Sequence, residues 1–436
     1  MGETPRLQAK PLGGPKGPGF FSWLYRARRA FVGFSRRGAQ NPSPSGEGDS
    51  ISERAEQSEG LIEGGLTAMG HKTVVRVICL SVLGVCLLTW QTSAQPPGTD
   101  VPTFVLDQAW PNVPAKWKLG DLSSVAVDTQ DHVWVLHRPR TLTPPDSTMA
   151  APPVLEFDAA GNFLQAWGGP GPGYEWPERE HGIHVDHTGH IWIGGNNCVG
   201  RNLPGLKNVS DDQLLKFTRT GKFVMQIGRS NQSGGNSDTR NLRQPSDAVV
   251  YPKTNEVFVA DGYANRRVIV FDANTGAFKR MWGAFGNRPV DHHVCPPPNP
   301  APVPDDGSRG SEQFDIVHVI RVSNDGLVYV GDRENKRVQV FTVDGKFLNQ
   351  VFIARDMPKV SRTAGALVLS SDPAQRFLYV VGGGQIAVLD RKTLQTVGSI
   401  KGSGGHHIAI DSKGNIYLAN MGGGRGPQKL VRKGPG

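Results

Sequence analysis

A six-fold internal repeat constrains the fold of this 436-residue chain more than any other feature. Its central marker is an aromatic residue between aliphatic ones, found at Val133-Trp134-Val135, Ile191-Trp192-Ile193, Val257-Phe258-Val259, Val328-Tyr329-Val330, Leu378-Tyr379-Val380 and Ile416-Tyr417-Leu418. An end marker recurs as GNFLQAWG from Gly161, GKFVMQIG from Gly221, GAFKRMWG from Gly276 and GKFLNQVF from Gly345. In the most complete copy, residues 257–283, apolar residues alternate at a period of two between turn residues, which predicts β-strands.

Six copies of a four-strand unit of about 40 residues predict an all-β, six-bladed β-propeller. An all-β solenoid is the alternative, but turn signals this frequent favour blades. The sixth copy ends at Lys429-Leu-Val-Arg432, one strand short. We therefore expect residues 103–110 to supply the missing strand and to close the ring, which removes open sheet edges.

The N-terminal residues differ from the repeats. Residues 1–68 are rich in Pro, Gly, Ser and charge, which predicts a disordered extension; the basic aromatic stretch 20–34 within it reads as a surface-binding helix or as sequence upstream of the true start. Residues 69–94 combine a basic start, an apolar run at 77–88 and the small residues Thr92-Ser-Ala94, which is typical of a secretory signal peptide. The sequence thus predicts a secreted or periplasmic propeller over residues 95–436, without a stable membrane span after cleavage; an uncleaved anchor is the alternative.

Charge and cysteine content narrow the partners. Residues 1–94 account for +4 of the formal net charge of +9, which leaves +5 on the exported part. Because this part shows no basic stripe with interleaved aromatics, we expect no nucleic-acid partner. We expect the exported part to be a monomer that acts on a small molecule or a peptide. Cys198 and Cys295 remain after signal cleavage, and a disulfide and two free thiols both fit. The pattern His292-His293-x-Cys295, in the insertion 287–310, fits a solvated loop or a metal site.

Histidines occupy one equivalent position in three alternate repeats. His181, His318 and His406 each precede the aromatic marker of their repeat by eleven residues. In a six-bladed ring they therefore lie about 120° apart at the same end of the innermost strands. Three converging imidazoles with an open position are the arrangement of catalytic Zn²⁺ sites. The alternative is that these histidines are satisfied core residues.

Three further side chains are expected over the same end of the ring. Arg138 and Arg333 follow the aromatic marker by four residues in the first and fourth repeats, and Tyr263 follows it by five in the third. A guanidinium beside a phenol favours the phenolate, and a second guanidinium can bind a carboxylate with two hydrogen bonds. For each residue alone, an ion pair at a blade edge or a packed ring explains it equally well.

Together these segments resemble one known family. HGIHVD at His181, VFVADGYANRR at Val257, VHVIRV at Val317 and GDRENKRVQVF at Gly331 are similar to segments of peptidylglycine α-hydroxyglycine α-amidating lyase, and the likeness spans residues 103–436. The generic blade pattern is shared with all NHL-repeat propellers. The resemblance implies a lyase that cleaves a peptidyl-α-hydroxyglycine to a peptide amide and glyoxylate.

The resemblance also implies roles for individual residues. His181, His318 and His406 would hold zinc, Tyr263 would be the catalytic base, Arg138 would lie beside it and Arg333 in the substrate cleft. Backbone carbonyls of Val125 and Ile183 would match those that bind a structural calcium in the family.

Two positions depart from the family pattern. An acidic calcium ligand would follow the third zinc histidine, but His407 stands there, and imidazole is not the hard oxygen ligand that calcium prefers. This puts calcium in question. The family's cysteine after the tyrosine is replaced by Ala264, so that disulfide is not expected.

Two other functions compete with a zinc lyase. A non-catalytic NHL-repeat propeller that binds a peptide or protein on one face would be folded without metal. A calcium-dependent, lactonase-like hydrolase would need carboxylates and amides around the axis, where this sequence has histidines.

Overall fold

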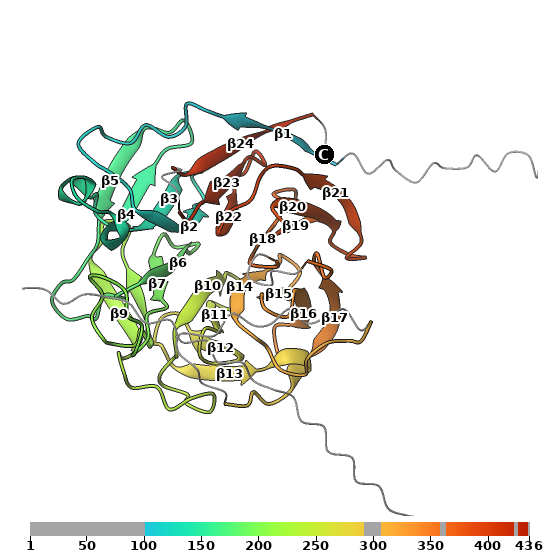
Figure 1. Cartoon of the computed structure of the whole chain (residues 1–436). Helices are drawn as coiled ribbons and strands as arrows, with labels where there is room; N and C mark the ends of the chain where they lie inside the picture. Colours follow the sequence, from blue (N-terminus) through green and yellow to red (C-terminus); the bar gives the residue numbers. More distant parts are fainter. Residues whose placement is uncertain (1–100, 292–306, 358–362, 423–425, 435–436) are drawn as a thin grey trace, which may run out of the picture. The chain divides into compact units, whose positions relative to one another are not determined.

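The computed structural model describes residues 101–291, 307–357, 363–422 and 426–434, all of which belong to the unit Ser93–Gly436. In this unit six four-stranded antiparallel sheets are arranged around a common centre, as Figure 1 shows. The predicted six-bladed β-propeller is confirmed. The predicted N-terminal extension, the signal peptide and the pattern at His292 lie outside the described residues.

The first three blades run from the innermost to the outermost strand in chain order. Their strands are β2 (Asp121–Val127), β3 (Val133–Arg138), β4 (Val154–Phe157) and β5 (Phe163–Trp167); β6 (Glu180–Val185), β7 (Ile191–Gly195), β8 (Gln213–Phe217) and β9 (Phe223–Gly228); β10 (Pro245–Tyr251), β11 (Glu256–Asp261), β12 (Arg267–Asp272) and β13 (Phe278–Trp282). Three short 3-10 helices, η1 (Pro139–Thr141), η2 (Asp146–Met149) and η3 (Ala284–Gly286), lie in connections.

The fourth and fifth blades repeat this order, and the sixth is completed by a strand from the other end of the propeller sequence. Their strands are β14 (Val317–Val322), β15 (Leu327–Asp332), β16 (Arg337–Thr342) and β17 (Phe347–Phe352); β18 (Ala366–Leu369), β19 (Phe377–Gly382), β20 (Gln385–Asp390) and β21 (Thr396–Ile400); β22 (His407–Ile410), β23 (Ile416–Ala419), β24 (Gln428–Lys433) and β1 (Thr103–Asp107). Thr103 of β1 pairs with Lys433 of β24. The predicted closure of the ring by residues 103–110 is therefore confirmed.

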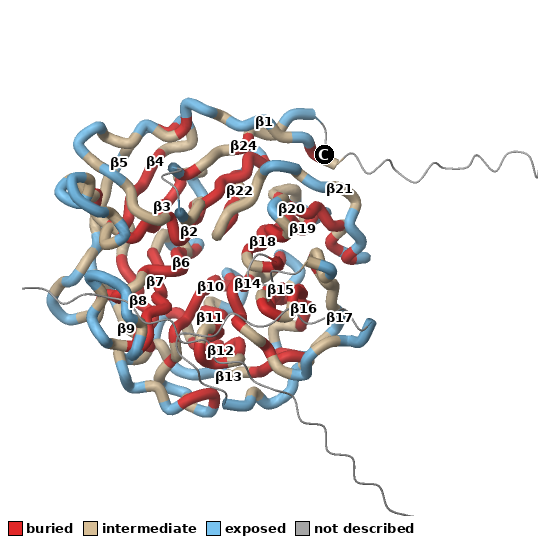
Figure 2. The backbone as a smooth tube through the Cα atoms, viewed as in Figure 1, coloured by how far each residue is buried: buried red, intermediate tan, exposed pale blue. Residues whose placement is uncertain are grey.

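The core lies between neighbouring blades. Figure 2 shows buried backbone along the inner and middle strands and exposed backbone along the outer ones. The aromatic residues of the central marker are 0–2% exposed. Two indoles and one phenol among them donate to an aspartate six residues earlier in the chain, as Trp134 does to Asp128, Trp192 to Asp186 and Tyr417 to Asp411. The marker thus combines apolar packing with a satisfied polar group, which a buried indole or phenol requires.

Four of the six innermost strands carry a β-bulge where they begin. The pairing shifts register between Leu122 and Ser124, Glu180 and Ile183, Pro245 and Asp247, and Val317 and Val319. A bulge bends the strand and re-aims a side chain. His181 and His318 both lie within these bulges, so the local backbone turns two of the predicted metal ligands toward the centre.

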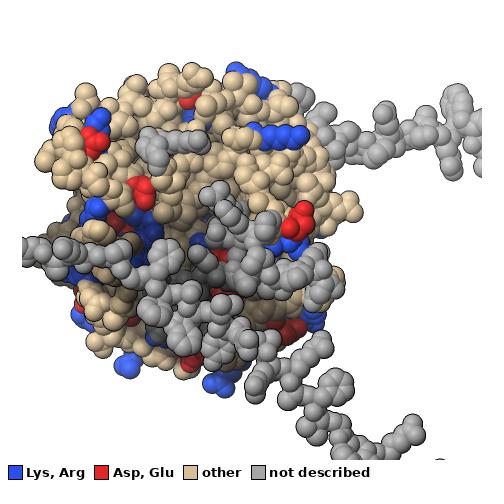
Figure 3. Space-filling model, in the orientation of Figure 1, with Lys and Arg blue, Asp and Glu red and all other residues tan. Residues whose placement is uncertain are grey.

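The described surface carries both signs of charge. Acidic side chains lie between the basic ones on the face drawn in Figure 3. Within the described ranges, no helix has the length and apolar character needed to cross a membrane.

Candidate functional site

Three imidazoles meet at one end of the propeller centre. His181 on β6, His318 on β14 and His406, which directly precedes β22, have ring centroids 4.7–5.0 Å apart. Their candidate ligand nitrogens all lie within 4.8 Å of one another. The structure therefore brings together all three histidines that the sequence spacing selects.

Each imidazole is oriented by the next blade. The Nδ1 atoms of His181, His318 and His406 lie 2.7, 2.5 and 2.6 Å from the backbone oxygens of Ser246, Gly365 and Ser123 respectively. A carbonyl oxygen can only accept, so each Nδ1 carries the proton and each Nε2 presents a lone pair. A carbonyl that fixes the tautomer in this way is the usual support of a metal-binding histidine.

The glycine after His181 is required by this contact between blades. A Cβ atom on Gly182 would lie 2.4 Å from the oxygen of Ser246, which is the acceptor of His181. Any larger residue would push the two innermost strands apart. The His-Gly pair in the sequence is thus explained by the close approach of the second and third blades.

Burial keeps the three imidazoles neutral. Burial, followed by the neighbouring imidazoles and arginines, holds the pKa of His181, His318 and His406 well below the ordinary value of 6.5. Neutral imidazole is the form that binds metal, so the donor set, its tautomers and its spacing all fit zinc. Among the described residues these histidines are one of two groups that could hold a metal ion.

The second group already contains a cation of the protein. Asp128, His132 and Glu156 lie between the first two blades, and the Arg219 guanidinium contacts all three. A guanidinium in this place compensates the two carboxylates. This cluster therefore reads as a polar link between blades.

Tyr263 lies directly over the imidazoles. Its hydroxyl is 3.0 Å from Nε2 of His181, 3.1 Å from Nε2 of His318 and 3.1 Å from a terminal nitrogen of Arg333. The Arg333 guanidinium also lies 5.3 Å from the centre of the phenol ring and pairs with Glu334 at 2.7 Å. The phenol is thus close to the open side of the imidazoles and beside a cation.

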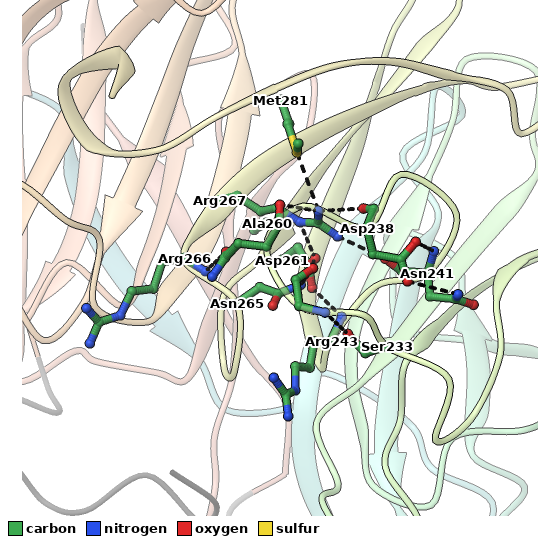
Figure 4. A network of polar contacts seen from close by, with 12 residues as sticks. Ser233, Asp238, Asn241, Arg243, Ala260, Asp261, Asn265, Arg266, Arg267 and Met281 are labelled. Carbon is green, nitrogen blue, oxygen red and sulfur yellow. Dashed lines mark hydrogen bonds and ion pairs between the residues drawn. The ribbon is translucent and has the colours of Figure 1, made fainter. Parts of the chain in front are cut away.

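Two similar turns present Tyr263 and Arg333. In the third blade the Asp261 carboxylate accepts from Asn265 and Arg267 at 2.8 Å each, and Figure 4 shows this network from close by. In the fourth blade Asp332 accepts from Asn335 and Arg337 at the same distances. Both aspartates and both arginines are 0% exposed.

These buried pairs were not predicted as site residues, although the sequence carries their signal. In each of these two blades the second strand ends in an aspartate, and an asparagine and then an arginine follow it in the chain. Gly262 in the first turn is also fixed by packing, because a Cβ atom there would lie 2.1 Å from the oxygen of Val317. The repeat therefore supplies the rigid support from which two functional side chains extend.

Arg138 approaches from the first blade. It ends β3 and is 3% exposed, with Nε donating to the oxygen of Glu180 at 2.7 Å and one terminal nitrogen 3.6 Å from the Met421 sulfur. Its other terminal nitrogen has no hydrogen-bond partner among the described residues. Burial, and then the charge of Arg179, lowers the pKa of Arg138 to about 9, while Tyr263 and nearby carboxylates act in the opposite direction. A buried guanidinium with a free donor is suited to an anionic ligand.

A different polar cluster follows His406 by one residue. His407 is 0% exposed, and its Nε2 lies 3.6 Å from Oδ1 of Asp247 across the ring from the sixth to the third blade. The other Asp247 oxygen accepts from Arg321 at 2.5 Å. Both ring nitrogens of His407 and Oδ1 of Asp247 lack a hydrogen-bond partner within the described ranges.

Calcium does not fit this donor set. His407 replaces the expected carboxylate, and the nearest carboxylate, Asp247, is already paired with the Arg321 guanidinium. A hard cation prefers several oxygen ligands and would be repelled by that guanidinium. The residues Val125 and Ile183, which the resemblance matches to the calcium carbonyls, are both buried on their inner strands. Nothing in the sequence pattern marks Asp247 or Arg321 as members of this cluster.

The connection between β7 and β8 is cross-linked. Cys198 is disulfide-bonded, and the other cysteines of the chain lie outside the described residues. The sequence left two readings open, a disulfide and two free thiols, and the reading of a free thiol at Cys198 is wrong. The bond fixes a loop that borders the site through Arg201.

Comparisons with known proteins agree with the repeat. The NHL repeat pattern matches residues 314–341. These residues run from β14, the innermost strand of the fourth blade, into β16, the third strand of the same blade. The chain contains an NHL repeat. A solved structure titled "Streptogramin B lyase structure" aligns at a TM-score of 0.44 and 13% identity, over 76% of this chain and 98% of that one.

Several relatives are amidating enzymes by name. Peptidyl-glycine alpha-amidating monooxygenase B of Xenopus laevis is 26% identical over 72% of this chain and 34% of its own length. Probable peptidyl-alpha-hydroxyglycine alpha-amidating lyase pgal-1 of Caenorhabditis elegans is 26% identical over 55% of this chain and 61% of its own. NHL repeat-containing protein 3 of Homo sapiens is 23% identical over 73% of this chain and 82% of its own length. The chain spans about a third of the length of the Xenopus monooxygenases that it matches.

Proposed function

We propose that this protein is a zinc-dependent lyase that cleaves an N-acyl α-hydroxyglycine to an amide and glyoxylate. The observation that carries the proposal is the contact of one phenol hydroxyl with two neutral, carbonyl-oriented imidazoles and with a guanidinium. Similarity to amidating lyases over 55% and 41% of this chain supports the same chemistry. His181, His318 and His406 would hold the zinc ion, which would polarise the substrate hydroxyl as a Lewis acid.

Tyr263 is the proposed general base. As a phenolate, stabilised by the neighbouring Arg333, it takes the proton of the substrate hydroxyl. The electron pair left on that oxygen forms the aldehyde C=O bond, and the C–N bond breaks with its electrons moving to nitrogen. The tyrosine proton then passes to this nitrogen, which gives a neutral amide and glyoxylate and regenerates the phenolate.

Arg138 is the proposed carboxylate-binding residue. Its buried terminal nitrogen has a free donor, and the charge of Tyr263 acts on it. A carboxylate held there would orient the hydroxyl toward Tyr263 and exclude water from the reacting carbon. Positioning of this kind would lower the barrier without any covalent role for the arginine.

Glyoxylate release from N-acyl α-hydroxyglycine by the full chain tests the proposal. We expect turnover that is lost with a zinc chelator, restored by zinc, and absent in His318→Ala. His187→Ala is the matched control, because His187 is an exposed imidazole of the second blade. Full activity in His318→Ala would refute the zinc lyase.

A non-catalytic binding propeller is the second candidate. Similarity to NHL repeat-containing protein 3, over 82% of its length, favours it, since that name implies no reaction. The proposal of a binding propeller predicts a folded protein that retains no zinc after dialysis. Metal analysis of the purified chain separates the two proposals.

Export is proposed from the sequence alone. The signal-peptide pattern at residues 69–94 predicts that the mature protein begins near Gln95. N-terminal sequencing of protein recovered outside the cytoplasm tests it, and a chain that begins at Met1 there would contradict cleavage.

A further inference from the structure

Two arginines near Tyr263 have no role in the proposed reaction. Arg179 directly precedes β6, and Arg201 lies in the connection between β7 and β8. Both belong to the second blade, which also contributes His181. Glu180 of β6 pairs with Gly195 of β7, so both segments lie at the end of the blade that holds His181, and Arg138 donates to the oxygen of Glu180 there.

Buried polar groups fix the backbone at both arginines. The Asp211 carboxylate, which is 0% exposed, accepts from the backbone N–H groups of Glu178, Arg179 and Asn197 at 2.7–3.0 Å. The N–H of Arg201 donates to the oxygen of Cys198 at 3.1 Å, and Cys198 is disulfide-bonded. The backbone from which both arginine side chains extend is therefore held in place by the fold.

Arg201 lies close enough to the Tyr263 phenol and to Arg179 for their charges to interact. Burial, and then Arg179, lowers the pKa of Arg201, while Tyr263 and Asp211 act to raise it. Arg138 experiences the same two neighbours, Arg179 and Tyr263. Arg138 and Arg201 thus lie near the same phenol, and Arg179 lies near both of these arginines.

Among the described residues, none of these three arginines forms an ion pair with a carboxylate, in contrast to their neighbours. Arg333 pairs with Glu334 and Arg140 with Glu178, both at 2.7 Å. Arg179 donates to the neutral amide of Asn196 at 2.6 Å, and the buried Nε of Arg201 has no hydrogen-bond partner among the described residues. Grouped guanidiniums with free buried donors are costly unless an anion completes them.

Within the described ranges, one buried donor without a partner lies on Arg138 and another on Arg201. The carboxylate of an α-hydroxyglycine would engage Arg138, and its acyl group must then extend away from that residue. Arg179 and Arg201 remain available on the second blade, where a planar guanidinium can bind a second carboxylate with two hydrogen bonds.

We propose that Arg179 and Arg201 form a second anion subsite, so that the substrate of the proposed lyase carries a further carboxylate on its acyl group. The inference rests on the proposed function and narrows its substrate class to N-acyl α-hydroxyglycines with an acidic acyl part, such as a peptide with Asp or Glu before the hydroxyglycine.

Paired substrates test this subsite with the zinc-loaded full chain. We compare kcat/KM for N-succinyl α-hydroxyglycine with that for the neutral N-succinamoyl analogue. The wild type should prefer the acidic substrate by about tenfold or more, as expected for charge-assisted hydrogen bonds. Arg201→Gln and Arg179→Gln should each remove most of that preference while leaving the neutral substrate unchanged.

Controls separate recognition from folding. Arg240→Gln removes one positive charge from an exposed position in the connection between β9 and β10 and should keep the preference. Arg201→Lys should retain part of it, since the charge stays but the planar fork is lost. Equal kcat/KM on the two substrates in the wild type would overturn the subsite while leaving the lyase intact.

A binding measurement decides the subsite even if no glyoxylate forms. Calorimetry with glutarate and zinc-loaded protein should show binding in the wild type and at least about tenfold weaker binding in Arg201→Gln. That result supports the subsite independently of the reaction. Equal glutarate binding by the two proteins, or none by either, overturns it.

Discussion

His406 and His407 are neighbours in the chain but belong to opposite kinds of site. His406 joins two other neutral imidazoles, those of His181 and His318, whose Nε2 atoms contact the phenol hydroxyl of Tyr263. His407 faces Asp247, which is already paired with Arg321. One layer of the propeller centre presents lone pairs that can bind a cation, and the next layer supplies its own cation.

The difference follows from strand geometry. Successive residues of a strand point to opposite sides, so His406 meets the blade ahead of it through Ser123 whereas His407 reaches the third blade across the ring. Metal dependence and structural support can therefore be altered separately by changing adjacent residues. The following predictions use that separation.

The largest effect is expected from removing one imidazole of the open layer. His406→Ala should lose bound zinc and all measurable glyoxylate release, because two imidazoles leave the tetrahedral site incomplete. His407→Ala should keep one zinc per chain. Metal analysis and the glyoxylate assay on both variants check this, and zinc retained by His406→Ala would contradict it.

Removing the carboxylate of the closed layer should cost stability instead. Asp247→Ala removes the buried carboxylate that pairs with the half-buried Arg321 guanidinium, and breaking a buried ion pair typically destabilises a protein by about 3–5 kcal/mol. Urea or thermal unfolding measures this. Replacing Asp247 and Arg321 together by Leu and Met should restore most of the loss, and an equal loss in the double variant would show that the pair is not the cause.

A carboxylate in place of His407 should create a calcium response. His407→Asp puts a second acidic group beside Asp247, where an oxygen-rich site can form. At a calcium concentration a hundred times the dissociation constant, the variant should gain about 2.7 kcal/mol and melt a few degrees higher. The wild type should melt at the same temperature with calcium or with a calcium chelator. A calcium-dependent shift in the wild type would show that the closed layer does bind the ion.

The smallest effect is expected in acid. Burial acts to raise the pKa of Asp247, but Arg321 and His407 outweigh it and hold the pKa below the ordinary value of 3.8. A depressed pKa in the folded state means that this carboxylate stabilises the fold above pH 3.8 and that the contribution is lost as the pH falls below it. Asp247→Asn should lack this component of acid destabilisation. Parallel pH profiles of unfolding for the two proteins would argue against it.

Much of the open layer could be predicted from the repeat. The equal spacing of His181, His318 and His406 from their aromatic markers determines the end of the ring and the angles between them. Period-two strands and a missing sixth-blade strand likewise predicted the pairing of β1 with β24. These features repeat locally, so one copy can be compared with another.

The closed layer and the second arginine group could not be predicted in the same way. Asp247, Arg321 and His407 come from three different blades and share no motif, and only the packing of the ring brings them together. Arg201 lies in a loop that the repeat does not specify. The β-bulges that aim His181 and His318 also depend on contacts with neighbouring blades, such as the approach of Gly182 to Ser246.

The pairing of Thr103 with Lys433 also sets the order in which the molecule can be completed. β1 lies before the other propeller strands in the chain and pairs with β24, so it stays unpaired until nearly all of them have been synthesised. Closure of the ring is therefore a late event that joins residues far apart in the sequence. His406 belongs to the sheet that this event completes. A nascent or C-terminally truncated chain can therefore form five blades and still lack the third imidazole, that of His406. Activity would then indicate that the sixth blade has formed and the ring has closed.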